Sequence, residues 1–410
     1  MPWPASAKYN GGFAFARADP PVPDSAAFTP TARRAVRSLV ASQIREVANA
    51  GMGDDGVLPF WFGEPDEVTP AFIRDAASAS LARGETFYSQ NFGIPELREA
   101  IAAYVSRLHG DVGADRIAVT ASGMSALMLA VEALVSPGDR AVVVTPMWPN
   151  LVEIPKILSA DVARVPLTFA RGRWTLDLDR LIDALTPGTR LVMINSPNNP
   201  TGWTIDGDTQ AALLAHCRRH GIWIVADDVY ERLVFDGGTC APSLLARAEP
   251  DERVVGTNSF SKAWCMTGFR LGWMVAPPSL MPDLGKLIEY NTSCSPVFVQ
   301  RAGVAAIENG EDTVARTRAR LRAARDLLVA ELARLPGIEV APPDGAMYAF
   351  FRVDGLTDSL SYCKRIVREA RLGLAPGGAF GTEGEGFIRW CFAASHERLA
   401  DGVSRLARFL

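Results

Sequence analysis

The sequence predicts an α/β protein: a large domain with a mostly parallel sheet covered by helices on both faces, and a smaller α+β domain. Two patterns lead to this prediction. Short apolar runs alternate with helical segments from about residue 116 to residue 276, as in parallel sheets buried on both faces. After about Ser295 a long helical tract and strand-like pieces follow. We therefore expect a large domain over residues 63–296 and a small domain made of residues 31–62 and 297–410.

Composition and charge are those of an ordinary globular protein. The 410 residues are 48% hydrophobic and 21% charged, which allows a sizeable core. The net charge of -4 predicts neither a nucleic-acid partner nor a membrane partner, and no apolar run approaches the length of a membrane span. The N-terminus lacks the order of a signal peptide, and the six cysteines form no CxxC pair. We expect reduced thiols, no metal site and a cytoplasmic location.

The elements before the large sheet are few. Residues 1–30 are rich in proline and glycine and are expected to form an extended arm. A helix is expected from Thr31 to Ala50. Thr69 is expected to cap a helix that begins at Pro70. A further helix is indicated by an apolar stripe at i, i+4, i+7 and i+8, made of Leu97, Ile101, Tyr104 and Val105.

The later elements are predicted from the periodicity of the apolar residues and the length of each apolar run. The expected strands of the large sheet are 116–121, 141–145, 190–195, 222–226, 253–257 and 271–276, and the helices among them are 124–135 and 209–220. In the small domain we expect a helical tract over 297–335, strands at 338–340, 346–353 and 388–392, a helix over 360–371 and a C-terminal helix.

A single lysine follows the expected strand 253–257. Lys262 would lie just past the carboxyl end of that strand, where open α/β sheets bind their ligands. A lysine there can form an imine with an aldehyde cofactor, and Ser259 and Arg270 could hold the phosphate of that cofactor. The alternative is a surface lysine, because charged side chains are mostly exposed.

Two further turns and one tryptophan could contact the same ligand. The run Ala121–Leu127 lies at a strand-to-helix turn, where a glycine and the free N–H groups of a helix N-terminus can bind phosphate, although tight turns of this kind are common. Trp148 follows a strand and could stack on a flat ring or belong to the core. Asn199, in the turn Ser196–Gly202, could donate to a phenolate oxygen, or the segment could be only a turn.

Three polar residues lie in or beside apolar strands. Asp227 ends the strand 222–226, and a buried carboxylate needs a partner such as a protonated pyridine nitrogen. Tyr230 could reach the oxygen of the same ring. The alternative is that Asp227 or Asp228 caps a helix. Arg389 lies among apolar neighbours, which favours a bidentate bond either to a substrate carboxylate or to a carboxylate of the protein.

Together these segments resemble the class I/II, fold-type I aminotransferases, which depend on pyridoxal 5'-phosphate (PLP). The resemblance extends from about Phe60 to the C-terminus, and its most specific parts are Ser196–Gly202, Asp227 with Tyr230, and Ser259–Gly272. It implies that Lys262 forms the Schiff base with PLP and that Asp227 pairs with the pyridine nitrogen.

The resemblance also implies roles for the other residues. Asn199 and Tyr230 would bond the ring oxygen, with Asn199 also beside the substrate, and Trp148 would stack on the ring. The phosphate would be held by Ser122, Gly123, Met124, Ser259 and Arg270. Arg389 would bind the substrate α-carboxylate, and the backbone of Gly63 would approach it. Tyr88 would reach the cofactor phosphate of the neighbouring subunit, which implies a homodimer with shared active sites.

The implied activity is a ping-pong transfer of an amino group between an L-amino acid and a 2-oxo acid. Relatives specific for dicarboxylic substrates supply an additional cation, in some cases where this chain has the uncharged Met124, so we expect neutral, apolar or aromatic substrates. Two alternatives are a carbon–sulfur lyase or other elimination enzyme on the same fold, because fold does not fix reaction, and a non-catalytic sensor. The segment before the large domain is too short and proline-rich for the DNA-binding module that such a sensor needs.

Overall fold

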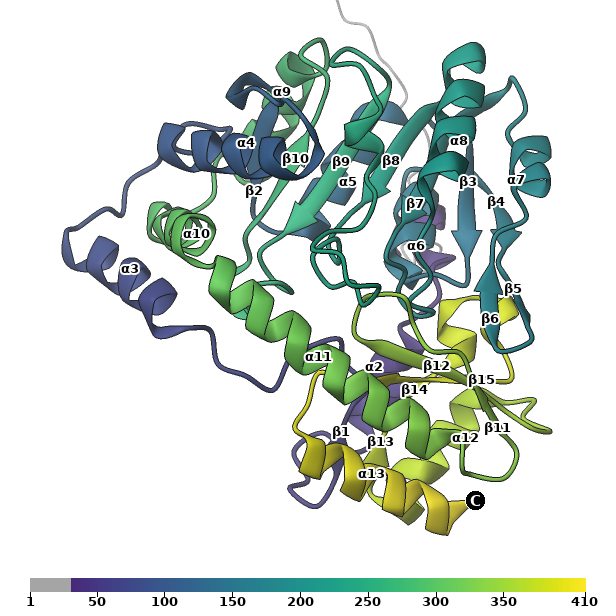
Figure 1. The fold of residues 1–410 in the computed structure, drawn as a ribbon. Coiled ribbons are helices and arrows are strands. Elements are labelled where there is room, and N and C mark those ends of the chain that lie inside the picture. The colour runs from purple at the N-terminus through teal and green to yellow at the C-terminus, as the bar shows by residue number, and fades with distance from the viewer. Residues whose placement is uncertain (1–30) are drawn as a thin grey trace, which may run out of the picture. The chain divides into compact units, whose positions relative to one another are not determined.

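The structure is a computed structural model that describes residues 31–410. The arm expected over residues 1–30 lies outside the described residues. The chain divides into two compact units, residues 1–38 and 39–410, and each is described by itself. The described part of the first unit holds one short helix, α1 (Arg34–Arg37). The second unit holds the other elements drawn in Figure 1.

A seven-stranded sheet forms the framework of the second unit. Its strand order is β2-β10-β9-β8-β7-β3-β4, and β10 runs antiparallel to both of its neighbours while the other pairs are parallel. The mostly parallel sheet that the sequence predicts is therefore confirmed. The strands are β2 (Ile117–Thr120), β3 (Arg140–Thr145), β4 (Asp161–Pro166), β7 (Thr189–Asn195), β8 (Trp223–Asp227), β9 (Val254–Ser259) and β10 (Gly272–Val275).

Helices cover both faces of this sheet (Figure 1). Along β3, Ala141 and Val143 pack into the core on the side of α5, whereas Val142 and Val144 pack into the core on the opposite side. Because both faces are buried, the four consecutive residues 141–144 of this strand are all apolar, whereas a strand with one exposed face is apolar at every second position. The helices that accompany the sheet are α3 (Ala71–Ala82), α4 (Pro95–His109), α5 (Gly123–Leu134), α6 (Pro149–Ile157), α7 (Leu178–Ala184), α8 (Gly207–His220), α9 (Met281–Asn291) and α10 (Val297–Asn309).

A smaller antiparallel sheet lies in the C-terminal part, with the order β11-β12-β15-β14. In Figure 1 the long helix α11 extends from α10 to this sheet. The elements here are α11 (Glu311–Leu332), β11 (Ile338–Val340), β12 (Tyr348–Val353), α12 (Ser359–Arg365), β14 (Ala375–Pro376), β15 (Phe387–Cys391) and α13 (His396–Phe409). The division of the chain at residues 62 and 296 stays a prediction.

The remaining pairings are short. Strand β1 (Leu58–Pro59) runs parallel to β13 (Leu372–Gly373), and β5 (Thr168–Ala170) forms a hairpin with β6 (Arg173–Thr175). Within residues 31–410, the helices are all too short or too polar to cross a membrane.

Three predicted helix features are wrong. The helix expected from Thr31 to Ala50 is two helices, because the Ser42 hydroxyl accepts the N–H of Arg45 and caps a new helix, α2 (Gln43–Asn49). Thr69 caps nothing: its hydroxyl donates to the carbonyl of Cys265, 2.5 Å away. The tract over 297–335 is interrupted at Gly310, between α10 and α11.

Candidate active site

A cavity of about 500 Å³ lies at the carboxyl ends of β7, β8 and β9. It collects eleven of the thirteen residues that the sequence indicates for the site. These are Gly63, Gly123, Met124, Trp148, Asn199, Asp227, Tyr230, Ser259, Lys262, Arg270 and Arg389. Ser122 is buried and is not among the lining residues, and Tyr88 lies elsewhere on the surface with 89% of its area exposed. The position of the cavity agrees with the rule that open α/β sheets bind ligands at the carboxyl ends of their strands.

Lys262 projects into this cavity from the turn after β9. Its Nζ donates a hydrogen bond to the carbonyl oxygen of Gly63, which comes from the distant loop after β1. Burial lowers the pKa of Lys262 to about 8, because a charged ammonium loses solvation there. The alternative of an ordinary surface lysine is therefore wrong, and the amine gives up its proton more readily than that of an exposed lysine.

Asp227 is the last residue of β8 and is buried. Its carboxylate accepts hydrogen bonds from the side-chain amide of Asn195 at 3.2 Å and from the N–H of Val229 at 3.4 Å. Burial raises the pKa of Asp227 to about 7. No helix begins at Asp227 or at Asp228, so the alternative of a helix cap is wrong. The carboxylate is placed to meet a cation that enters the cavity.

The turn between β2 and α5 brings backbone N–H groups to the same cavity. Ser122 caps α5, because its hydroxyl accepts the N–H of Ser125 at 3.0 Å. A Cβ on Gly272 would lie 2.4 Å from the nitrogen of Gly123, so only glycine lets β10 approach this turn. Arg270 also lines the cavity, and its backbone adopts the left-handed conformation, with a φ of 55°. The N-terminus of α5 and this guanidinium together favour an anion.

Arg389 comes from β15 and is 2% exposed. Its guanidinium donates to Oδ1 of Asn199 at 3.1 Å and to the carbonyl of Trp61, while its Nε has no partner. The guanidinium carbon lies 4.5 Å from the centre of the Tyr348 ring. No carboxylate within residues 31–410 pairs with Arg389, so the alternative of an internal salt bridge is wrong. An unpaired buried guanidinium can bind a carboxylate that enters from outside.

Twelve residues of the lining were not found by sequence reasoning, among them four polar residues that bear on the chemistry of the site. Asn195 directly precedes the turn Ser196–Gly202, and Ser261 lies within the stretch Ser259–Gly272, so the sequence motifs could have indicated both. Tyr348 starts β12 and Arg45 lies on α2, far from those motifs in sequence. No local pattern marks either of them, since a tyrosine in an apolar strand resembles core and an arginine on a short helix resembles surface.

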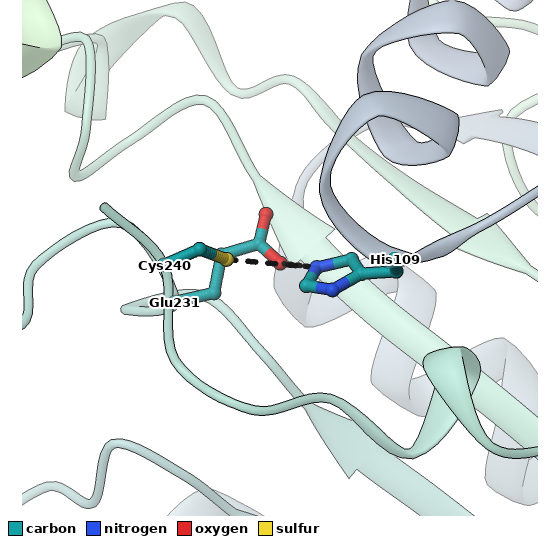
Figure 2. Close-up of side chains that lie close together, drawn as sticks. All are labelled: His109, Glu231 and Cys240. Atoms are coloured by element: carbon teal, nitrogen blue, oxygen red, sulfur yellow. Dashed lines mark hydrogen bonds and ion pairs between the residues drawn. The ribbon is translucent and has the colours of Figure 1, made fainter. Parts of the chain in front are cut away.

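A buried polar cluster lies outside this cavity and supports the segment after β8. His109, Glu231 and Cys240 place their polar atoms within 4.8 Å of one another, and Figure 2 shows the His109 ring beside the other two. The Nε2–Oε2 distance of 2.7 Å is that of a hydrogen bond, whereas two ligands of one tetrahedral zinc lie about 3.3 Å apart. Glu231 also accepts from Asn258 at 2.8 Å. We interpret the cluster as a hydrogen-bonded support, because the donors already satisfy the carboxylate.

The comparison with known protein families decides the family. Residues 57–406 match the family model described as aminotransferase class I and II. The chain belongs to the class I and II aminotransferases. This aminotransferase is therefore an enzyme, and membership of the family implies the use of PLP.

Individual relatives agree with this assignment. The aminotransferase is 33% identical to an aspartate aminotransferase of Pyrococcus horikoshii over 90% of this chain and 94% of the relative. It is 30% identical to aromatic-amino-acid aminotransferase 2 of Thermococcus litoralis, over 90% of this chain and 95% of that one. Among solved structures, aspartate aminotransferase of Thermus thermophilus with maleate superposes with a TM-score of 0.86 at 31% identity, covering 93% of this chain and all of the other.

Proposed function

We propose that this aminotransferase moves an amino group between an L-amino acid and a 2-oxo acid by a ping-pong mechanism, with PLP held in the 500 Å³ cavity. One observation carries the proposal. The cavity holds a lysine amine, a buried carboxylate and a buried guanidinium, none of which has an ion-pair partner within residues 31–410. Lys262, Asp227 and Arg389 are therefore free to meet groups that a cofactor and a substrate bring.

The residues present fit PLP at both of its ends. Asp227 would hold the protonated pyridine nitrogen, which fits a buried carboxylate whose pKa is raised to about 7 and which lacks a cation. Ser122, Gly123, Met124, Ser259 and Arg270 would hold the phosphate, at the helix N-terminus described above. When bound, PLP supplies an aldehyde for the substrate amine and a ring that accepts electrons.

The ring would be held between these two ends. Trp148 follows β3 and borders the cavity, where its indole would stack on the pyridine ring. Asn199 and Tyr230 would donate to the ring oxygen from the loops after β7 and β8. Since these donors sit on different strand ends of one sheet, the sheet fixes their spacing.

Lys262 would carry the proton in the reaction. Its pKa, lowered to about 8, lies close to neutral pH, so that Nζ can both accept a proton and return it. The backbone of Gly63, whose carbonyl oxygen accepts from Nζ in the structure, would approach the substrate carboxylate. Arg389 would fix the α-carboxylate by two parallel bonds and so orient the substrate against the ring.

For the substrate side chain we propose neutral, apolar or aromatic groups. The apolar part of the cavity wall contains Ile44, Phe62, Met124 and Leu127. Met124 stands where a cation would favour a second carboxylate, and its sulfur is 3.3 Å from the side-chain amide of Asn150. One relative, from Thermococcus litoralis, is named for aromatic amino acids, which agrees with a wall of this kind.

A second candidate is a dicarboxylic substrate, favoured by Arg45. Its guanidinium borders the cavity and lies 4.6 Å from the centre of the Phe62 ring. It has no carboxylate partner within residues 31–410. The relative from Pyrococcus horikoshii is named for aspartate, and the Thermus thermophilus structure was determined with maleate. Rotation of Arg45 away from Phe62 would supply the missing cation.

The test is a panel of amino acids added to the purified protein loaded with PLP. A donor should change the visible absorbance of the bound cofactor and yield its 2-oxo acid, and Lys262→Ala should abolish this turnover; full turnover by that variant would refute the role of Lys262. In Arg45→Ala, aspartate and glutamate should lose about 100-fold in kcat/KM if Arg45 binds their second carboxylate, whereas phenylalanine should be unaffected. Equal effects on both classes would exclude the second candidate.

We further propose a cytoplasmic homodimer with shared active sites. Tyr88 and Tyr290 are each 89% exposed and Phe87 is 84% exposed, and aromatic side chains with so much of their area exposed are candidates for a contact with another subunit. A partner subunit that covers them would bring Tyr88 to its own phosphate site. Activity of mixed Tyr88→Ala and Lys262→Ala subunits tests whether the two sites are shared.

A further inference from the structure

Tyr348 stands between the two ends of the proposed site. Its hydroxyl oxygen lies 2.7 Å from that of Tyr230, and its ring lies 4.5 Å beneath the guanidinium of Arg389. It is 1% exposed and borders the cavity. Tyr348 therefore contacts both the residue proposed for the cofactor's ring oxygen and the residue proposed for the substrate carboxylate.

The hydrogen bond between the two phenols has a direction that matters. Each hydroxyl carries one proton, so one phenol must donate and the other accept. If Tyr230 is to donate to the cofactor, its proton must remain free and its oxygen must accept from Tyr348. The structure gives the Tyr348 hydroxyl no other acceptor within residues 31–410.

We propose that Tyr348 is a positioning residue that donates to Tyr230, turns the Tyr230 proton toward the cofactor ring oxygen and supports Arg389 with its ring face. This inference rests on the proposed function. The donation polarises the Tyr230 O–H bond and so strengthens the next hydrogen bond in the chain, because neighbouring hydrogen bonds polarise one another. The ring face contributes separately, since a guanidinium over an aromatic face is held by the charge distribution of the ring.

The surroundings hold Tyr348 in this position. Its ring meets that of Tyr230 edge to face, with centres 5.7 Å apart and an angle of 82°. On the other side, a Cβ on Gly63 would lie 1.8 Å from the Tyr348 hydroxyl, so only glycine leaves room for it. Burial raises the pKa of both phenols, which keeps both protons in place near neutral pH. The pairing of Tyr348 with Cys391 in the sheet fixes the backbone.

Two variants separate the two contributions. Tyr348→Phe removes the hydroxyl and keeps the ring, so the pH midpoint of the bound cofactor's absorbance should rise by roughly 0.2 to 1 unit, because the ring oxygen is then less well stabilised as an anion. The KM for amino acids should change less than about 2-fold, since the support of Arg389 remains. Tyr348→Leu removes both, and should add a rise in KM of about 10-fold.

Tyr104→Phe is the matched control. Tyr104 is equally buried, at 1%, but its hydroxyl contacts Glu231 and Arg232, and it does not border the cavity. Its loss should leave the absorbance midpoint unchanged. If the wild-type protein is active but Tyr348→Phe has the same absorbance midpoint as Tyr104→Phe, the inference about Tyr348 is overturned while the proposed function stands. A wild-type protein that binds PLP but converts no amino acid would instead refute the proposed function.

Discussion

Removing His109 should destabilise the protein much more than removing another equally buried histidine. His109 is 7% exposed and its Nε2 is 2.7 Å from the carboxylate of Glu231. His109→Ala leaves that carboxylate buried with no other ion-pair partner within residues 31–410, and Asn258 and Tyr104 are then its side-chain donors. Breaking a buried pair by removing one partner typically costs about 3–5 kcal/mol, because the remaining charge is left uncompensated.

His216 provides the matched control. It is 8% exposed, and its Nε2 is 2.8 Å from the backbone carbonyl of Leu185, so no buried charge depends on it. His216→Ala therefore loses packing and one neutral hydrogen bond, the latter about 0.5–1.5 kcal/mol. The free energies of unfolding should be measured by urea denaturation with saturating PLP, because ligand binding contributes to apparent stability.

The difference between the two variants should be about 2 kcal/mol or more. Adding Glu231→Gln to His109→Ala should recover about 1–3 kcal/mol, since the buried charge is then removed. The reasoning is refuted if His109→Ala loses no more stability than His216→Ala, or if the second substitution makes the first one worse.

Three further outcomes follow from the same geometry. Arg389→Lys should lower kcat/KM for every amino acid by about 100-fold, because a lysine cannot make two parallel bonds; unchanged kinetics would assign the carboxylate to another group. Burial lowers the pKa of His109, but the hydrogen bond and the charge of Glu231 outweigh it, so the pKa in the folded protein is raised above 6.5. The contribution of the His109–Glu231 pair to the stability of the fold is therefore full below pH 6.5 and is lost as the pH rises through the folded-state pKa. Above pH 6.5, the difference in unfolding free energy between wild type and His109→Gln should fall by at most about 1.4 kcal/mol per pH unit. A difference that grows with pH would contradict this prediction. Mixed dimers of Tyr88→Ala and Lys262→Ala subunits should regain activity, because one site then has both residues, whereas no recovery would place Tyr88 outside the partner's site.

The sequence predicts six of the seven strands of the large sheet, because each of the six is a short apolar run that the fold buries. It misses the edge strand β4, which contains Asp161 and Arg164 and is mostly only half-buried. It misses α6, which starts at Pro149 and contains Pro155, a residue that normally ends a helix. It also misses α9, where Pro282 and Gly285 obscure the helical pattern. In both helices, packing against the sheet outweighs the local preference of the residues.

The site divides in the same way. Asp227 and Lys262 could be predicted because each follows an apolar strand, and the carboxyl ends of adjacent parallel strands meet at one edge. Tyr348 and Arg45 could not, because their place depends on how β12 and α2 approach that edge, and no short-range pattern encodes it. Tyr88 was indicated by resemblance alone, and its role stays a prediction.

The cavity holds charged groups in a way that stability alone does not explain. Burial shifts the pKa of Asp227 up to about 7 and that of Lys262 down to about 8, and each shift disfavours the charged form. Arg389 stays buried with an unpartnered Nε. A protein selected only for stability would pair these groups with one another or replace them with apolar ones. Their separation makes sense if ligands supply the opposite charges. The pyridine nitrogen of PLP and the carboxylate of the substrate would then offset, on binding, the free energy that the burial of these protein groups costs.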